Sequence, residues 1–385
     1  MTTIFSPTEL TARLIAFDTT SRLSNLALID FAQDMLEANG ARCRRSHNAD
    51  GSKANLFASL GPDRDGGIVL SGHTDVVPVD GQDWSSDPFK AETHDGRLFG
   101  RGACDMKGFV ATALSLVGEI AAAKLARPIH FALSFDEEVG CAGVPALLDD
   151  LRKAGIKPAL AIVGEPTMMK VVGAHKGGTA VRTRCKGHEG HSSAPQKGAS
   201  AVMMAGEFVS LIARLGRELE ADCDPRFEPP FTTTQANVIS GGTALNILAG
   251  AAQIVWECRP LPGRDGRTVV ARAQALAESD ILPRYRRGAP EAAIESTITS
   301  QYPGLALDPE SPAVALALEL TGANRAETVA YGTEAGHFQA AGIPAVICGP
   351  GSIDQAHKAD EFVDLSQLEA CEAFLRKVIA KAVVG

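Results

Sequence analysis

Four short apolar segments of this chain each lead into a polar cluster that contains histidine or carboxylate side chains. The segments and the clusters that follow them are 68–70 with S-G-H-T-D at 71–75, 129–133 with S-F-D-E-E at 134–138, 160–163 with G-E-P at 164–166, and 345–347 with G-P-G at 349–351 and then His357. Short continuous apolar runs are typical of strands that are buried on both faces. Because ligand sites of open α/β sheets lie at the carboxyl ends of the strands, the four clusters predict one site at one edge of a sheet.

Helical patterns over 109–123 and 144–154 separate these segments. Two further helices are predicted near the start of the chain. One begins at a capping box formed by Ser6 and Glu9, and the other spans 26–36. This order of elements predicts an α/β domain whose mixed, mostly parallel sheet is covered by helices.

The middle of the chain has a different pattern. It predicts, in order, a strand at 179–185, a helix at 199–219, strands at 233–239 and 251–258, a helix at 268–277 and a strand at 293–299. The order β-α-β-β-α-β is that of a ferredoxin-like α+β unit. We therefore expect an inserted domain at 178–300 that splits a larger domain into 1–177 and 301–385.

The composition limits the partners of the chain. Its 385 residues carry 37 Lys and Arg against 46 Asp and Glu, a net charge of −9, and the basic residues form no block. Such a surface argues against nucleic acid or an acidic membrane as the partner. The first 17 residues show no leader pattern, no apolar run reaches the roughly 18 residues of a membrane span, and the eight cysteines are scattered. We expect a cytoplasmic protein with reduced thiols and a small-molecule substrate.

Five side chains of the predicted site are candidate metal ligands: His73, Asp105, Glu138, Glu165 and His357. Imidazole nitrogen and carboxylate oxygen suit borderline divalent metals such as zinc. Five donors are too many for one catalytic ion that must also hold water. They suit two ions about 3.5–4 Å apart that share a carboxylate and a water molecule.

Two neighbours of these ligands have candidate roles of their own. Asp75 follows His73 by two residues, so in an extended segment its carboxylate is placed to accept the other imidazole N–H. Glu137 directly precedes Glu138, so one carboxylate can bind metal while the other serves as a general base. A single H-x-D or Glu-Glu pair is a solvated loop in most proteins, and it is the joint placement of these motifs after predicted strands that favours catalysis.

Several of these stretches resemble the co-catalytic zinc exopeptidase family over nearly the whole chain. The matching motifs are S-G-H-T-D-V-V-P-V at 71–79, G-R-G-A-C-D-M-K-G at 100–108, D-E-E-V-G at 136–140 and V-G-E-P-T at 163–167. The resemblance implies two zinc ions per subunit, with cobalt as an alternative. It implies that His73 and Glu165 hold one ion, that Glu138 and His357 hold the other, and that Asp105, through a cis peptide to the next residue, bridges both.

The resemblance also implies roles for residues that are not metal ligands. Glu137 would be the general base and acid, and the inserted domain at 178–300 would be a lid through which two copies form a homodimer. His191, in G-H-E-G-H-S-S at 187–193, would stabilise the oxyanion in the partner's active site. Asn246 and Arg259 would hold the α-carboxylate of the substrate.

Within this family, three stretches are most similar to the members that remove the acetyl group from N2-acetyl-L-ornithine, giving acetate and L-ornithine for arginine synthesis. They are Y-G-T-E-A-G-H-F at 331–338, G-P-G-S-I-D-Q-A-H-K-A-D-E-F-V at 349–363 and E-C-R-P-L-P-G at 257–263. Acetylcitrulline, other N-acyl amino acids, N-succinyl-diaminopimelate and a carboxypeptidase reaction on a peptide bond stay open. A catalytically silent relative that only binds amino acids or a protein partner is a second class of function. The intact Glu137 and the five candidate ligands argue against it.

Overall fold

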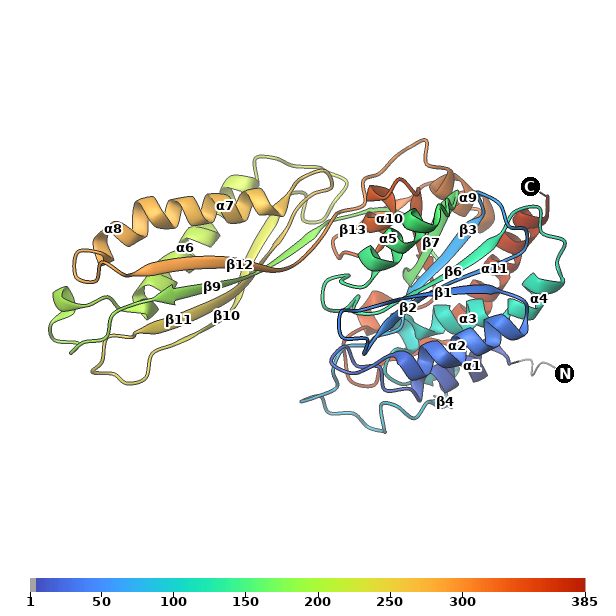
Figure 1. The fold of residues 1–385 in the computed structure, drawn as a ribbon, viewed down its shortest axis with the longest axis horizontal. Helices are drawn as coiled ribbons and strands as arrows, with labels where there is room; N and C mark the ends of the chain where they lie inside the picture. Colours follow the sequence, from blue (N-terminus) through green and yellow to red (C-terminus); the bar gives the residue numbers. More distant parts are fainter. Residues whose placement is uncertain (1–4, 385) are drawn as a thin grey trace. The chain divides into compact units, whose positions relative to one another are not determined.

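A mixed eight-stranded sheet forms the framework of the larger part of the chain in the computed structural model, which describes residues 5–384 (Figure 1). The strand order is β1-β2-β6-β3-β7-β14-β8-β13. The strands are β1 (Arg42–His47), β2 (Ala54–Leu60), β3 (Ile68–His73), β6 (Ile129–Ser134), β7 (Leu160–Pro166), β8 (Val172–His175), β13 (Glu327–Val329) and β14 (Ala345–Gly349). The parallel pairs β6–β3, β3–β7 and β7–β14 lie at the centre, so their carboxyl ends meet at one edge.

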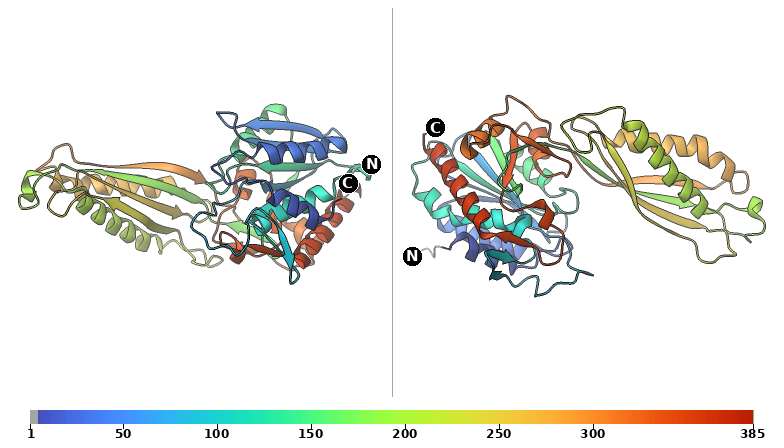
Figure 2. Two further views of the ribbon diagram at one scale, coloured as in Figure 1. Left: turned by 90° about the horizontal axis from the view of Figure 1, so that it is seen from below. Right: turned by 180° about the vertical axis from the view of Figure 1, so that it is seen from behind.

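Helices cover both faces of this sheet (Figures 1 and 2). The helices are α1 (Pro7–Ile15), α2 (Leu26–Ala38), α3 (Gly108–Ser115), α4 (Val117–Ala122), α5 (Val144–Ala154), α9 (Pro312–Thr321), α10 (Ala335–Ala340) and α11 (Leu365–Val384). Helices α2, α3, α9 and α11 pack over the face that carries the largest apolar core, and α5 and α10 pack on the other face. The single helix predicted at 109–123 is two helices, because Leu116 takes φ −90° and ψ 0° between them.

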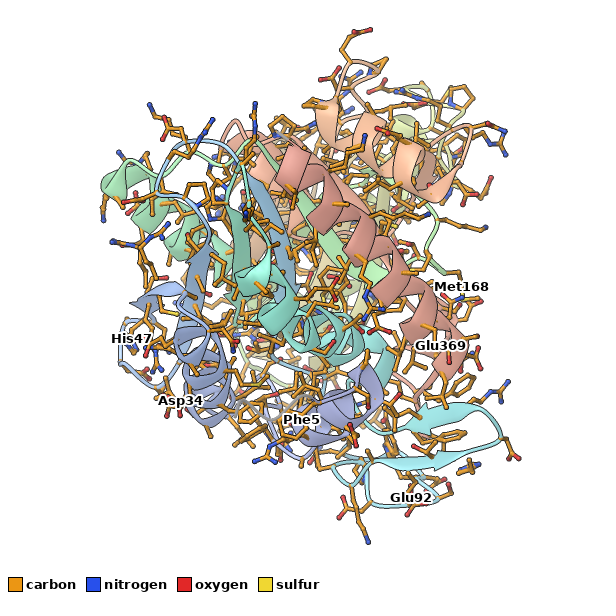
Figure 3. All side chains as sticks on the ribbon, turned by 90° about the vertical axis from the view of Figure 1, so that its right-hand side faces the viewer. Phe5, Asp34, His47, Glu92, Met168 and Glu369 are labelled. Carbon is orange, nitrogen blue, oxygen red and sulfur yellow. The ribbon has the colours of Figure 1, made fainter. Side chains whose placement is uncertain are left out.

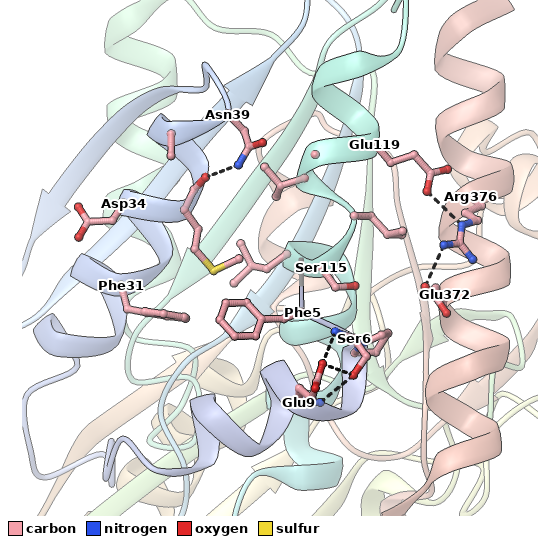
Figure 4. Close-up of a pocket in the computed structure, with 17 residues that line it drawn as sticks. Phe5, Ser6, Glu9, Phe31, Asp34, Asn39, Ser115, Glu119, Glu372 and Arg376 are labelled. Carbon is pink, nitrogen blue, oxygen red and sulfur yellow. Dashed lines mark hydrogen bonds and ion pairs between the residues drawn. The ribbon is translucent and has the colours of Figure 1, made fainter. Parts of the chain in front are cut away.

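The start of α1 shows how the sequence sets a helix end. Ser6 accepts a hydrogen bond from the Glu9 N–H at 3.2 Å, and the Glu9 carboxylate accepts one from the Ser6 N–H at 2.9 Å. This capping box confirms the prediction, and it lies beside a pocket that also exposes the Glu119–Arg376 ion pair (Figure 4). The lining residues of this pocket within the described chain include none of the predicted site residues.

A small antiparallel sheet, β15-β5-β4, accompanies the large one. Its strands are β4 (Glu92–His94), β5 (Arg97–Phe99) and β15 (Phe362–Asp364), and Figure 3 shows Glu92 on this hairpin. β15 brings residues close to the C-terminus beside β5, which lies just before the segment that carries Asp105. The sheet therefore joins two parts of the sequence that are more than 250 residues apart.

A second compact unit, His175–Gly304 with Val329–Gly332, has its own sheet and core. Its elements are β9 (Gly178–Lys186), α6 (Ala201–Leu219), β10 (Thr233–Gly241), β11 (Ala251–Arg259), α7 (Gly266–Leu276), α8 (Leu282–Tyr285) and β12 (Ala293–Tyr302). The antiparallel order β10-β11-β9-β12, with α6 and α7 on the sheet, is the ferredoxin-like arrangement. The fold class predicted from the sequence is confirmed.

The core of this unit is built around Trp256 of β11. Trp256 is 1% exposed, its ring meets Phe208 of α6 edge-on, and its indole N–H donates to Thr183 Oγ1 at 2.9 Å. A buried indole needs such an acceptor, so sheet and helix are fixed together without an unsatisfied polar group. Across residues 5–384, no helix combines the length and the apolar character that crossing a bilayer requires.

Candidate metal centre

The carboxyl ends of the central parallel strands bring the predicted ligands together. β3 ends at His73, Glu165 is the last residue but one of β7, and Glu138 follows β6. The loop after β14 carries His357, and Asp105 lies in an irregular turn over Ala103–Lys107. The peptide bond between Asp105 and the next residue is cis, as the resemblance implied.

The carboxylate of Asp105 lies between the two histidines. Its Oδ1 is 3.0 Å from Nε2 of His73, and its Oδ2 is 3.4 Å from Nε2 of His357. His73 Nε2 is also 3.9 Å from a carboxylate oxygen of Glu165, and His357 Nε2 is 3.0 Å from Glu138 Oε2. One carboxylate thus faces two separate histidine–glutamate pairs, one on each of its oxygens.

Among residues 5–384, two groups of three side chains have ligand atoms within 4.8 Å of one another. One group is His73, Asp105 and Glu138, and the other is His73, Glu137 and Glu165. Glu137 therefore lies as close to His73 and Glu165 as a ligand would. Its role as a free base stays a prediction.

Burial and charge act against each other on these groups. Burial raises the pKa of Glu138 to about 7, helped by the charge of Asp105, and it raises the pKa of Glu165 well above its ordinary value. Burial disfavours a charged His73, but Asp105 and Glu165 outweigh it and raise the pKa of that imidazole. Hydrogen bonds to Asp105 and Glu138 raise the pKa of His357 to about 10. The cluster is thus an excess of buried acid that attracts positive charge.

This donor set fits divalent cations. Among the described residues, no lysine or arginine forms an ion pair with Asp105, Glu137, Glu138 or Glu165. Buried carboxylates are normally paired or coordinate metals, because an isolated buried charge is very costly. Carboxylate oxygen with imidazole nitrogen suits zinc and similar ions, and the arrangement around Asp105 suits a pair of them.

Asp75 holds this centre differently from the expectation. His73 Nδ1 is 2.9 Å from the backbone carbonyl oxygen of Asp75, whereas the Asp75 carboxylate is 3.7 Å away. That carboxylate accepts hydrogen bonds from the N–H groups of Glu137 and Glu138, at 3.0 and 3.3 Å, and from the Ser21 hydroxyl at 2.7 Å. Because these donors occupy it, the imidazole uses the carbonyl, and the carboxylate fixes the Glu137–Glu138 turn instead.

The other predicted site residues belong to the second unit. His191 is exposed, and its Nδ1 is 2.8 Å from the Ser193 hydroxyl. Asn246 is exposed and adjoins Ile247, which forms a β-bridge with His191. Arg259, at the end of β11, pairs with the Glu257 carboxylate at 3.0 and 3.1 Å. His191 and Asn246 thus share one region of this unit, and the guanidinium of Arg259 already has an acidic partner.

One buried acid beside the centre received no role from the sequence. Glu334 at the start of α10 is 1% exposed, and neither of its carboxylate oxygens has a hydrogen-bond partner within the described chain. Burial raises the pKa of Glu334 to about 7, and its charge contributes to the raised pKa of Glu137. In the sequence, Glu334 directly follows Gly-Thr in the motif at 331–338. That motif indicated the family, but it did not indicate that this carboxylate is buried.

Comparison with known proteins agrees with this geometry. Residues 69–381 match the model of peptidase family M20/M25/M40. Acetylornithine deacetylase of Myxococcus xanthus is 38% identical over 95% of both chains, and that of Proteus mirabilis is 33% identical over 96% of this chain and 93% of its own. The metallo-carboxypeptidase Sso-CP2 of Sulfolobus solfataricus has the same fold, with a TM-score of 0.74, 16% identity and 99% and 100% coverage. The chain therefore belongs to peptidase family M20/M25/M40, and it is a metallohydrolase.

Proposed function

We propose that this enzyme removes the acetyl group from N2-acetyl-L-ornithine, releasing acetate and L-ornithine. The observation that carries a hydrolytic reaction is the Asp105 carboxylate, whose two oxygens face His73 and His357 at 3.0 and 3.4 Å. The relatives named acetylornithine deacetylase, which match this chain almost from end to end, support the substrate. A cytoplasmic location is part of the same proposal.

Zinc is the metal that we propose, with cobalt as the alternative. His73 and Glu165 would hold one ion, Glu138 and His357 the other, and Asp105 both. Such ions, when bound, would lower the pKa of a water molecule toward ~7 and would polarise the acetyl carbonyl. The buried acids of this centre are the support, because divalent charge offsets the cost of keeping them ionised.

Glu137 is the residue that we propose to move the proton. It would take a proton from the attacking water and deliver it to the amine of the leaving ornithine. Burial raises the pKa of Glu137 well above its ordinary value, with a further contribution from Glu138, which suits a group that must hold a proton briefly near neutral pH. The thiol of Cys141 donates to Glu137 Oε1 at 3.2 Å, and Asp75 holds its backbone. The first contact orients the carboxylate, and the second fixes the backbone that carries it.

The second unit would bind the substrate and form a homodimer. Its edge strand β10 exposes Val238 and Ile239, by 53% and 55%. The same unit also exposes Val202, Met203, Leu245 and Ile247. An edge strand with apolar side chains is suited to pairing with a second copy. In that dimer His191 would stabilise the oxyanion in the partner's site, and Asn246 and Arg259 would hold the substrate's α-carboxylate.

The test is primary-amine release by chelator-treated protein after zinc is added back. The substrates are N-acetyl-L-ornithine, N-acetyl-L-citrulline, N-acetyl-L-methionine, N-succinyl-diaminopimelate and a Gly-Glu dipeptide. We expect a zinc-dependent preference for acetylornithine of at least tenfold in kcat/KM. A preference for another compound would overturn the substrate and leave the reaction class.

The control for the mechanism is Glu137→Ala. We expect it to bind two zinc ions per chain, as the wild type does, and to lose at least 100-fold in kcat, the lower end of what general acid–base catalysis contributes. Near-normal turnover with both metals bound would refute the role of Glu137. A wild-type chain that binds no zinc and turns over none of the substrates would instead support a binding protein.

A further inference from the structure

The carboxylate of Glu361 lies behind the candidate metal centre and accepts four hydrogen bonds. Its Oε1 accepts from the backbone N–H groups of Cys104 and Asp105, at 2.9 and 3.0 Å. Its Oε2 accepts from the Gly102 N–H at 3.0 Å and from Arg101 Nη1 at 2.7 Å. Glu361 and Arg101 are each 1% exposed, so this side chain fixes the turn that carries Asp105 from inside the protein.

Gln82 continues this network toward the other side of the centre. Its Oε1 accepts from Arg101 Nη2 at 2.5 Å and from Trp84 Nε1 at 3.0 Å. Its Nε2 donates to the backbone carbonyl of His357 at 2.8 Å. Three side chains, Glu361, Arg101 and Gln82, therefore connect the backbone at Asp105 to the backbone at His357.

Polar contacts hold the part of the loop around His357. The side chain of His357 is 55% exposed, and its backbone has a φ of 63°, in the left-handed region that non-glycine residues rarely adopt. Asp360, three residues on, has a φ of 54° and accepts from Ser85 at 2.9 Å. Because apolar packing does not surround an imidazole this exposed, the position of His357 depends on polar contacts such as the one from Gln82 to its backbone carbonyl.

We propose that Glu361, Arg101 and Gln82 are positioning residues that set the separation of Asp105 and His357, and so the affinity of the metal position that these two share with Glu138. The inference rests on the proposed dinuclear centre. Glu361 fixes Asp105, which faces both positions, whereas Gln82 fixes His357, which faces one. Loss of the Gln82 amide therefore weakens one metal position, and loss of the Glu361 charge weakens both.

The sharpest variant is Gln82→Glu. A carboxylate there keeps two acceptors for Arg101 and Trp84, but it removes the donor to the His357 carbonyl and places an oxygen against it. Zinc is titrated into chelator-stripped protein and heat is recorded, with the melting temperature as a check of folding. We expect one of the two zinc ions to bind at least tenfold more weakly than in the wild type, and the other within twofold, because groups that orient ligands typically contribute 10–100-fold in affinity.

Two further variants complete the design. Glu361→Gln removes the charge and turns one acceptor into a donor, which in either orientation of the amide faces N–H donors. We therefore expect both zinc ions to bind at least tenfold more weakly. Asp364→Asn is the matched control. It removes the carboxylate charge from the exposed Arg97–Asp364 pair, whose acidic partner lies on β15, and both affinities should stay within twofold. If Glu361→Gln fails to fold, Gln82→Glu decides, because it leaves the Glu361–Arg101 pair in place.

The outcomes separate this inference from the function beneath it. A wild-type chain that binds fewer than two zinc ions would refute the dinuclear centre itself. A wild type with two ions, and a Gln82→Glu variant with both affinities unchanged, would refute the positioning role alone. Equal weakening of both ions by Gln82→Glu would also refute it, because the contact to His357 reaches one metal position.

Discussion

Gly164 of β7, the residue before Glu165, packs so closely against the ring of Phe109 that it leaves no room for a side chain. A methyl group added there would lie 1.9, 2.1 and 2.3 Å from ring atoms of Phe109, whereas ordinary van der Waals contact begins at 3.4 Å. The ring must therefore move by about 1.5 Å. Phe109 is 1% exposed in the main core, so it has nowhere to move without displacing its neighbours. The close approach of α3 to β7 depends on this glycine.

The variant Gly164→Ala should be less stable by about 3 kcal/mol, the upper end of the usual cost of overpacking, because the ring is held on all sides. In a unit of this size that corresponds to a fall in melting temperature of about 6–12 °C. Zinc affinity should fall as well, since Glu165 shares the displaced strand segment. Calorimetry of the stripped protein gives the first quantity, and zinc titration gives the second.

A double-mutant cycle isolates the clash from other effects of the added methyl group. Phe109→Ala alone should cost about 3–5 kcal/mol, because it leaves a cavity. In the double variant the methyl group of residue 164 enters that cavity, so the two costs should not add, and the coupling should favour the double variant by about 2–3 kcal/mol. A Gly164→Ala protein that melts within 2 °C of the wild type, or strictly additive costs, would refute the reasoning.

Three other predictions follow from single features of the structure. Burial lowers the pKa of His337 to about 4, so the folded state loses stability as the pH falls from about 6.5 to 4, by at most about 3 kcal/mol. In a plot of the free energy of unfolding against pH, His337→Gln should reduce the slope in that window, and a curve parallel to that of the wild type would contradict the prediction. Ile239→Lys places a charge on the exposed edge strand β10 and should give monomers by light scattering. Val383→Lys, on α11, should leave the oligomeric state unchanged. A dimer that survives Ile239→Lys would exclude β10 as the dimer interface. Hydrogen bonds to Asp105 and Glu138 raise the pKa of His357 to about 10, so zinc must displace the proton of this imidazole. The affinity for zinc should therefore rise with pH, and calorimetry in two buffers measures the proton release. A zinc affinity that does not change with pH would oppose His357 as a ligand.

The ligand types and their gathering at one sheet edge could be predicted because the rule behind them is local. An apolar segment that ends in His73 or Glu165 shows both the strand and the point where it stops. Once parallel neighbours are recognised, the side chains at these points must meet. The ferredoxin-like order of the second unit was predictable for the same reason, since each of its elements has its own periodicity.

The partner that each ligand uses was not predictable in the same way. The spacing of Asp75 from His73 indicated a contact, but not that the carbonyl would make it at 2.9 Å. That outcome depends on Ser21 and on the N–H groups of the 137–138 turn, which lie more than 50 residues away and occupy the carboxylate first. Competition among donors is a property of the folded chain, and spacing along the sequence does not contain it.

The hydrogen bonds that connect Glu361, Arg101 and Gln82 were the least predictable from the sequence, because they join distant parts of it. Their energetics indicate what they contribute. Glu361 reaches the N–H of Asp105 across 256 positions of sequence, and Gln82 reaches His357 across 275. A buried ion pair such as Arg101–Glu361 contributes little net stability, because desolvation of the two charges offsets much of their attraction. What this pair does provide is direction, since three backbone N–H groups and one guanidinium converge on a single carboxylate and allow the turn before Asp105 one arrangement. The residues that bind metal can therefore be recognised one motif at a time, whereas the residues that keep those motifs a fixed distance apart are found only when the fold brings them together.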